Sequence, residues 1–269
     1  MSATHLPVHG VRAYNTAATS ENKIHDDSVA QKFGFTGALV PGVEVYAYMA
    51  HMPVLRWGRA WLERGEAECR FAKPVYDGRM VYVSARDDAG ALAITVEGDS
   101  VVNATGRASM PEDSRSSRAK DALPTAAPPV ARPDASVTSL AKDVALGIAP
   151  MTIDRTLLAR YLEDIRETDP IYLNENLVHP GQILRLCNAA LVQNVVLGPW
   201  IHVGSKVRNF ALARVGDELS VRSRILSNYD SKGHDIVEFD AMIVANGVTV
   251  VSEIIHTAIW RPRHVRDAS

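Results

Sequence analysis

Two stretches of the chain place apolar residues at the three- and four-residue spacing of a buried helix. They run over 43–62 and 182–198, and each follows a Pro-Gly pair. The apolar positions are Val45, Tyr48, Met49, Met52, Leu55 and Trp61 in the first, and Ile183, Leu186, Ala190, Val192, Val195 and Val196 in the second. Pro53 and Gly58 predict a break or kink in the first helix. We expect both apolar stripes to be core.

Six shorter runs alternate β-branched and polar residues and end in turns rich in Gly, Asp and Asn. They cover 79–86, 91–97 and 99–108 in the first part of the chain, and 218–226, 236–244 and 248–260 in the second. Consecutive strands joined by short turns form an antiparallel sheet with one buried face. The pattern therefore predicts an α+β fold in which each half of the chain is one long helix wrapped by one curved antiparallel sheet.

The two halves repeat the same order of elements at nearly the same spacing. Gly42 precedes Gly78 by 36 residues, and Gly181 precedes Gly216 by 35. Such self-similarity predicts an internal duplication.

Residues 109–137 separate the halves. Pro, Ala, Ser and alternating charges dominate this segment, and it has no apolar periodicity. This composition is typical of a linker, which buries too little surface to offset its ordering entropy. We therefore expect an N-terminal half at 1–108, a Pro/Ala/Ser-rich linker at 109–137 and a C-terminal half at 138–269.

Composition narrows the class of protein. Hydrophobic residues make up 46% and charged residues 22%, and the formal net charge is −2. These values are ordinary for a globular protein and give no broad electrostatic footprint for nucleic acid or an anionic membrane. No apolar run is long enough to span a membrane, and the N-terminus lacks the apolar core of a signal peptide. Cys69 and Cys187 form neither a disulfide framework nor a metal site, so we expect a cytoplasmic protein in a reducing compartment.

The segment before the first long helix carries candidate chemistry. Asp27 is placed to cap a short helix, and Asn22 and His25 precede it on a loop near the long helix. The N–H groups of Gly42 and Val43 at the start of the long helix have no intrahelical partner and favour negative charge. An imidazole beside such an oxyanion site suits proton transfer next to a thioester carbonyl.

This segment and the strand that follows the helix resemble the MaoC-like, R-specific enoyl-CoA hydratase family. The shared motifs are N-x-I-H-x-D, A-x-x-x-G-F-x-G-x-L-x-P-G and R-F-x-x-P-V-x-x-G. They are carried here by Asn22, Ile24, His25, Asp27, Ala30, Gly34, Phe35, Gly37, Leu39, Pro41 and Gly42, and then by Arg70, Phe71, Pro74, Val75 and Gly78. The resemblance implies the hot-dog fold, and the two halves resemble its double hot-dog members.

The family's catalytic motif is incomplete in the first half. The family pairs an acid with a histidine as D-x-x-x-x-H, but Ser20 stands in the acid's place, five residues before His25. Gly42 fits the family's oxyanion glycine, although Pro41 replaces the histidine that usually precedes it.

The second half departs from the motif in the opposite way. Alignment on Pro170 puts Glu167 at the acid's place, Asp169 at the asparagine and Tyr172 at the histidine. His179 lies near the family's histidine before the helix glycine. The second half thus keeps a carboxylate and lacks the catalytic histidine.

Three hypotheses follow from this split. In the first, Glu44 from the first turn of the long helix, or Glu167 from the facing loop, supplies the carboxylate beside His25. In the second, His25 alone shuttles a proton, as in an isomerisation. In the third, catalysis is lost and a binding cleft remains. Four other histidines lack metal-ligand spacing, so we expect structural or exposed roles for them; they are His51, His202, His234 and His256.

The sequence therefore predicts a hydro-lyase that acts on an enoyl or 3-hydroxyacyl thioester of coenzyme A or acyl carrier protein. The candidate catalytic residues are His25, Asn22, Glu44 and Glu167, and the candidate substrate-binding residues are Gly42, Val43, Pro41, Tyr172 and His179. We expect no metal or redox cofactor. Alternatives are a thioesterase or isomerase in the same cleft, and a non-catalytic acyl-binding subunit. The expected partner is the small-molecule acyl thioester, with no nucleic acid and no membrane, and the edge strands of such sheets allow a homodimer.

Overall fold

The predicted strands form one continuous antiparallel sheet in the computed structural model, which describes residues 6–112 and 116–263. The first half supplies β1 (His9–Arg12), β2 (Glu66–Phe71), β3 (Met80–Asp88), β4 (Ala91–Gly98) and β5 (Val101–Ser109). The second half supplies β6 (Met151–Thr152), β7 (Ile201–Asn209), β8 (Glu218–Ser231), β9 (His234–Ala245) and β10 (Thr249–Arg261). The spatial order is β1-β3-β4-β5-β2-β7-β10-β9-β8-β6.

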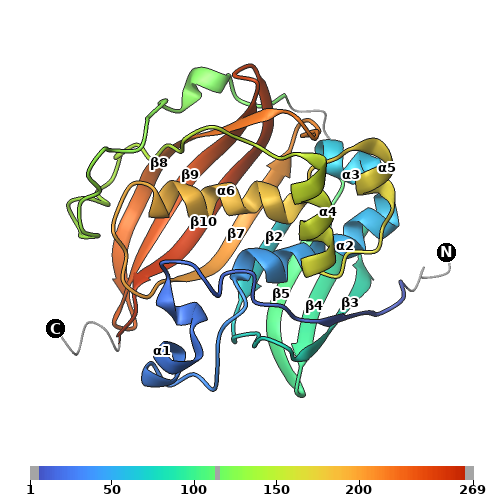
Figure 1. Cartoon of the computed structure of the whole chain (residues 1–269). Helices are drawn as coiled ribbons and strands as arrows, with labels where there is room; N and C mark the ends of the chain where they lie inside the picture. Colours follow the sequence, from blue (N-terminus) through green and yellow to red (C-terminus); the bar gives the residue numbers. More distant parts are fainter. Residues whose placement is uncertain (1–5, 113–115, 264–269) are drawn as a thin grey trace.

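The two long helices lie side by side against one face of this sheet, one for each half (Figure 1). They are α2 (Gly42–Trp57) and α6 (Pro180–Val192), and the buried residues of both join the main core. The predicted break in the first helix falls at Gly58, whose φ is +57°, and α3 (Arg59–Arg64) follows it. Pro53 stays inside α2. Helix α6 ends at Val192, before the predicted end at 198.

A central seam joins the halves. Strand β2 of the first half pairs with β7 of the second, with Cys69 opposite Ser205 and Arg70 opposite Gly204. The seam therefore places the start of β7 beside the N-terminal end of α2. Any cavity at that end of α2 is built from both halves of the chain.

Short helices precede both long helices along the chain. The loop before α2 forms η1 (Lys23–His25) and α1 (Asp27–Lys32), and Asp26, not Asp27, caps α1 by accepting from Val29 N at 3.2 Å. Asp27 instead accepts from Ala38 N at 2.6 Å. The sequence analysis did not predict α4 (Arg155–Asp164) and α5 (Ile171–Glu175), which precede α6.

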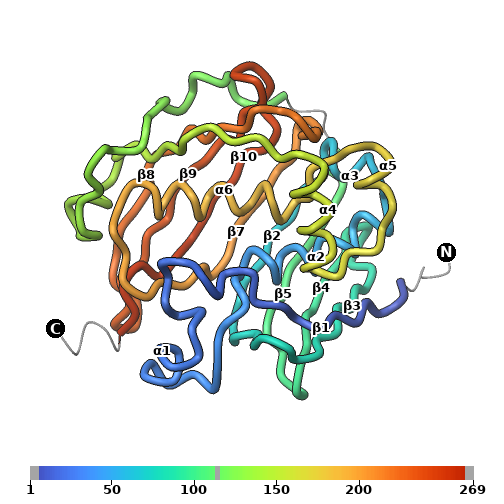
Figure 2. Tube along the Cα trace, in the orientation of Figure 1, coloured from blue at the N-terminus to red at the C-terminus, as the bar shows by residue number. Residues whose placement is uncertain are grey.

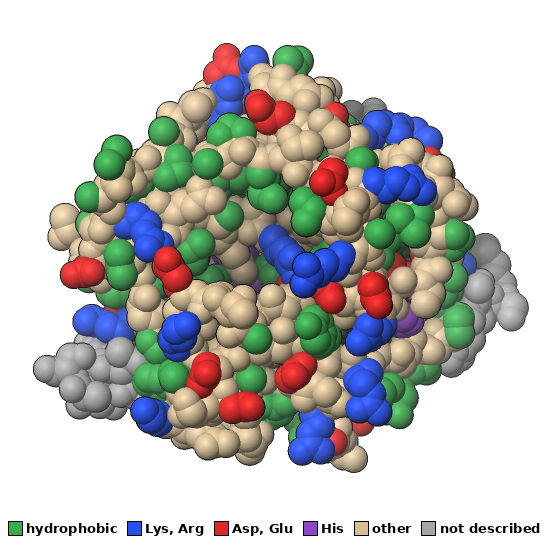
Figure 3. Space-filling view, viewed as in Figure 1, with side chains coloured by type: hydrophobic (Ala, Val, Ile, Leu, Met, Phe, Trp, Pro, Cys, Tyr) green, Lys and Arg blue, Asp and Glu red, His purple; other side chains and the backbone are tan. Residues whose placement is uncertain are grey.

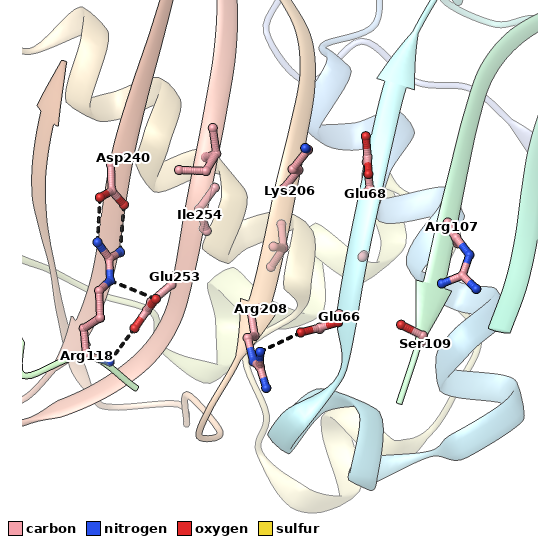
Figure 4. Close-up of a pocket in the computed structure, with 13 residues that line it drawn as sticks. Glu66, Glu68, Arg107, Ser109, Arg118, Lys206, Arg208, Asp240, Glu253 and Ile254 are labelled. Atoms are coloured by element: carbon pink, nitrogen blue, oxygen red, sulfur yellow. Dashed lines mark hydrogen bonds and ion pairs between the residues drawn. The ribbon is translucent and has the colours of Figure 1, made fainter. Parts of the chain in front are cut away.

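The segment at 109–137 makes specific contacts with the second half, contrary to the expectation that it buries little. After η2 (Lys120–Ala122), Leu123 is 1% exposed and packs with Met242 and Val244. Arg118 bonds to Asp240 at 2.6 Å and to Glu253 at 2.9 Å (Figure 4). Figure 2 follows the chain from the end of β5 around the β8 side of the sheet. A few strong contacts at fixed points thus hold a segment that has no apolar periodicity.

Candidate active site

The loop that carries Asn22 and His25 is fixed from three sides. Ile24, between them, is 1% exposed. Asn15 Nδ2 donates to the carbonyl of His25 at 2.8 Å. Asn22 Nδ2 donates to Trp200 O at 2.9 Å, and Asn22 Oδ1 lies 3.3 Å from Trp200 N. This reciprocal pair crosses from the first half to the second and sets which way the Asn22 amide points.

These contacts also set the protonation of the His25 ring. Nδ1 lies 2.6 Å from the carbonyl oxygen of Leu39, which can only accept, so Nδ1–H is the donor. Nε2 then carries the lone pair, and it faces the Asn22 amide nitrogen at 3.4 Å. Burial lowers the pKa of His25, and the bond to Leu39 opposes that shift in part. His25 is therefore neutral at pH 7, with Nε2 as a base.

The N-terminus of α2 supplies free donors beside this ring. The amides of Glu44 and Val45 bond to Pro41 O. Within the described part of the chain, no hydrogen bond engages the amides of Gly42 and Val43. Because helix N-terminal amides carry partial positive charge, these two stay the candidate oxyanion donors.

A cavity of about 260 Å³ is lined by both His25 and Gly42, and we call it the His25 cavity. Its walls come from Asn22, Ile24, His25, Phe35, Leu39, Val40, Pro41, Gly42, Val45 and Phe71–Val75 of the first half, and from Asn188, Trp200–Val203, His234 and Ile259 of the second. It adjoins a space of about 720 Å³ that shares His25 and Trp200 and is also lined by Glu44. Figure 3 shows this face hollowed near its centre, with histidine atoms deep inside and Lys or Arg atoms at the rim.

Glu44 lies close to the cavity, but its carboxylate is already bonded. The side chain is 1% exposed, and it accepts from Tyr161 Oη at 2.8 Å, Arg185 Nε at 2.7 Å and Thr16 Oγ1 at 3.0 Å. None of the hydrogen bonds made by His25 within the described residues goes to a carboxylate. The structure thus brings His25, Asn22, Pro41, Gly42 and Val43 together and gives Glu44 three other partners.

Glu167 lies in a separate cluster, which it shares with His51 of α2. Its carboxylate accepts from His51 Nδ1 at 2.9 Å and from the amides of Thr168 and Asp169, both at 2.7 Å. His179 Nε2 is 3.7 Å away. Burial opposes ionisation, but the bond from His51 and the nearby ring of His179 outweigh it and hold the pKa of Glu167 well below its usual range. The structure does not place Glu167 or His179 in the wall of the His25 cavity.

The corresponding position in the second half is filled by side chains. A Cβ on Gly181, at the start of α6, would lie 2.1 Å from Tyr161 Oη and 2.7 Å from Ala47 Cβ. The Gly181 amide donates to His179 Nδ1 at 3.0 Å. Tyr172 packs 4.6 Å from the His179 ring and is 0% exposed. The predicted binding residues Tyr172 and His179 therefore line this filled counterpart.

The sequence analysis missed three residues that line the His25 cavity. Each has a buried polar atom with no hydrogen-bond partner in the described structure. The atoms are Asn188 Oδ1, Trp200 Nε1 and His202 Nδ1. The sequence predicts a structural or exposed role for His202, whereas the structure buries it to 4% exposure in the wall of this cavity. Its place in the cavity depends on the register of the β2–β7 seam, which no local sequence pattern reveals.

A cavity of about 450 Å³ lies on the opposite face of the sheet (Figure 4). Its cations largely pair with its own acids: Arg118 bonds to Asp240 and Glu253, and Arg208 Nη1 lies 2.9 Å from Glu66. Because most of its charged side chains pair with one another and none of its described lining residues begins a long helix, this cavity is a weaker candidate site.

No model of a known protein family matches the sequence, and no curated protein matches it. Solved structures do match. A putative MaoC domain protein dehydratase from Chloroflexus aurantiacus aligns with a TM-score of 0.64 at 12% identity, covering 96% of this chain and 94% of that one. A conserved hypothetical protein from Mycobacterium tuberculosis with a double hotdog fold gives 0.63 at 16% identity, covering 95% and 96%.

The chain has a double hot-dog fold. This confirms the fold predicted from the sequence. The dehydratase domain of RzxB from Pseudomonas fluorescens shares the fold with a TM-score of 0.51 at 12% identity, covering 83% of this chain and 86% of that one. At these identities, the double hot-dog likeness establishes the fold and leaves the reaction to be argued from the site.

Two further observations concern the described residues alone. None of their helices is long and apolar enough to cross a membrane. Among them, no group of three or more His, Cys, Asp or Glu side chains is arranged to hold a metal ion.

Proposed function

We propose that this double hot-dog protein is a hydro-lyase that adds water to an enoyl thioester, or removes it from a 3-hydroxyacyl thioester. One observation carries the proposal: the Nε2 lone pair of a neutral His25, which meets only a long 3.4 Å contact from the Asn22 amide among the described residues, faces the same cavity as the free amide of Gly42. A base beside an oxyanion site is the pairing that proton transfer next to a carbonyl requires. The dehydratases with this fold support the reaction class.

The proposed reaction uses His25 as a single base. Nε2 takes one proton from water, the water oxygen attacks Cβ of the enoyl group, and the electron pair moves to the thioester oxygen. The amides of Gly42 and Val43 stabilise that oxyanion. The proton on Nε2 then passes to Cα as the enolate collapses, so that one water is added in total. Dehydration follows these steps in reverse.

The surroundings of the cavity suit a phosphopantetheine carrier. A neighbouring space of about 630 Å³ shares Phe71 and Ala72 with the His25 cavity. Arg70 and Lys232 line that space and Lys73 lines the cavity itself, and within the described residues none of the three is in an ion pair. Unpaired cations at this position match the phosphates shared by coenzyme A and acyl carrier protein.

Purified protein incubated with crotonyl-CoA tests the proposal. We expect loss of the enoyl absorbance and a product heavier by one water. The variant H25Q removes the imidazole base, and we expect it to lose at least a hundredfold in kcat/KM while unfolding at the wild-type temperature. Full turnover by folded H25Q contradicts the assignment.

Double-bond isomerisation is the second candidate. It is favoured by the absence of a carboxylate partner for His25 among the described residues, because one base can remove and return one proton. Isomerisation leaves the substrate mass unchanged, so the mass of the product separates the two reactions. Release of free thiol would instead identify a thioesterase.

A further inference from the structure

A chain of three buried polar residues leads from the interior of the sheet to the His25 cavity. His202 and Ser205 belong to β7, and His256 belongs to the neighbouring β10. Ser205 Oγ lies 2.9 Å from His202 Nε2 and 3.0 Å from His256 Nδ1, and the two imidazole rings stack at 4.0 Å. All three residues are at most 4% exposed.

The contacts of His202 fix which ring nitrogen carries its proton. Nε2 lies 3.1 Å from the carbonyl oxygen of Gly204, which can only accept. Nε2–H is therefore the donor, to Gly204 O and to Ser205 Oγ, and the hydroxyl of Ser205 donates to His256 Nδ1. Nδ1 of His202 is left with a lone pair.

That lone pair has no partner among the described residues and lies at the oxyanion end of the cavity. Nδ1 is 2.9 Å from the position that a Cβ on Gly42 would occupy. Phe71 closes one side of the ring with its edge, at 4.9 Å between centroids. A buried acceptor without a donor is unfavourable, so a group that lines a ligand cavity in this state is placed to bind a donor on the ligand.

We propose that His202 Nδ1 accepts a hydrogen bond from the hydroxyl group of the substrate, or from the water that becomes that hydroxyl. The inference rests on the proposed hydro-lyase function and assigns a role that neither half's motif supplies. His25 takes one proton of the water, and His202 orients the other O–H bond, which stays intact throughout. No covalent bond to His202 forms or breaks.

Two properties favour an acceptor over a second base. Burial lowers the pKa of His202 to about 3, so Nδ1 is too weak a base to take a proton from water at pH 7, although it can still accept a hydrogen bond. The Gly204 carbonyl holds the proton on Nε2, away from the cavity. The site therefore selects acyl chains that present an O–H donor close to the thioester.

A matched pair of variants tests this role. In H202N the side-chain amide can place its oxygen near the position of Nδ1, whereas H202Q can reach the partners of Nε2 and leaves no acceptor at Nδ1. We expect H202Q to lose about tenfold to a hundredfold in kcat/KM for crotonyl-CoA hydration, and H202N to stay within about tenfold of wild type.

Binding measurements separate this inference from the hydro-lyase proposal. We expect H202Q to bind 3-hydroxybutyryl-CoA about fivefold to tenfold more weakly than wild type, and to bind butyryl-CoA, which lacks the hydroxyl, equally well. Equal weakening for both ligands, or equal hydration by H202Q and wild type, overturns the role of His202. Absence of hydration by the wild-type protein overturns the proposed function, and the two-ligand comparison still tests the acceptor. H202F supplies the same comparison if H202Q unfolds.

Discussion

The variant E44Q tests whether the buried carboxylate of Glu44 has a structural or a catalytic role. Glu44 connects α2 to α4 through Tyr161 and to α6 through Arg185. Loss of one partner from a buried ion pair costs about 3–5 kcal/mol. The Arg185 side chain is 37% exposed and regains water in the variant, and the glutamine still accepts one hydrogen bond. We therefore expect a cost of about 2 kcal/mol.

This cost corresponds to a fall of about 4–8 °C in the unfolding midpoint for a chain of this size. Calorimetry of wild type, E44Q, R185M and the double variant would measure the coupling between the two residues. If the carboxylate is structural, hydration by E44Q at 25 °C stays within about fivefold of wild type. An unchanged midpoint together with a hundredfold loss of hydration would refute this reasoning and restore Glu44 as the missing acid.

Four further predictions follow from individual residues. Because the pKa of His25 is lowered, kcat/KM for hydration should be flat above pH 6.5 and fall at lower pH as Nε2 is protonated. A pH–rate profile measures this, and a midpoint above pH 6.5 contradicts it. G42A should lose at least tenfold in hydration, because its Cβ would lie 2.9 Å from His202 Nδ1; unchanged kinetics would show that the helix terminus can shift. L123A should destabilise the protein by about 2–5 kcal/mol in urea unfolding if residues 109–137 are held as described, and a loss under 0.5 kcal/mol would contradict that. Burial lowers the pKa of His9 to about 4 and that of His202 to about 3, so below pH 6.5 the unfolded chain binds more protons than the folded one. The unfolding free energy should therefore fall as the pH decreases from 6.5 toward 3. Constant stability over that window would contradict this prediction.

Local patterns in the sequence predicted most of the fold. The spacing of apolar residues located α2 and α6, and the break at Gly58 follows from a backbone conformation that glycine adopts easily. The repeat of Pro-Gly, helix and strands predicted two similar halves. Helices α4 and α5 were not predicted, although Asp154 marks the start of α4 as an N-cap.

The candidate site was predicted only where one segment contains it. Asn22, His25 and Gly42 lie within 21 residues of one another, so their motif could be read directly. The pairing of Glu44 with Arg185 joins residues 141 apart in the chain. The position of His202 depends on strand register at the β2–β7 seam. Tertiary packing sets both the Glu44–Arg185 pairing and the position of His202, and the spacing of residues along the sequence does not reveal that packing.

The filled counterpart at Gly181 bears on ligand stoichiometry. A molecule with two equivalent clefts would bind two acyl thioesters and could show cooperativity between them. Here the Gly181 amide already donates to His179 Nδ1, and Tyr161 Oη and Ala47 Cβ pack against that glycine. If the proposed function holds, only the first half's helix terminus is available to the ligand, and a calorimetric titration should saturate at one acyl thioester for each polypeptide.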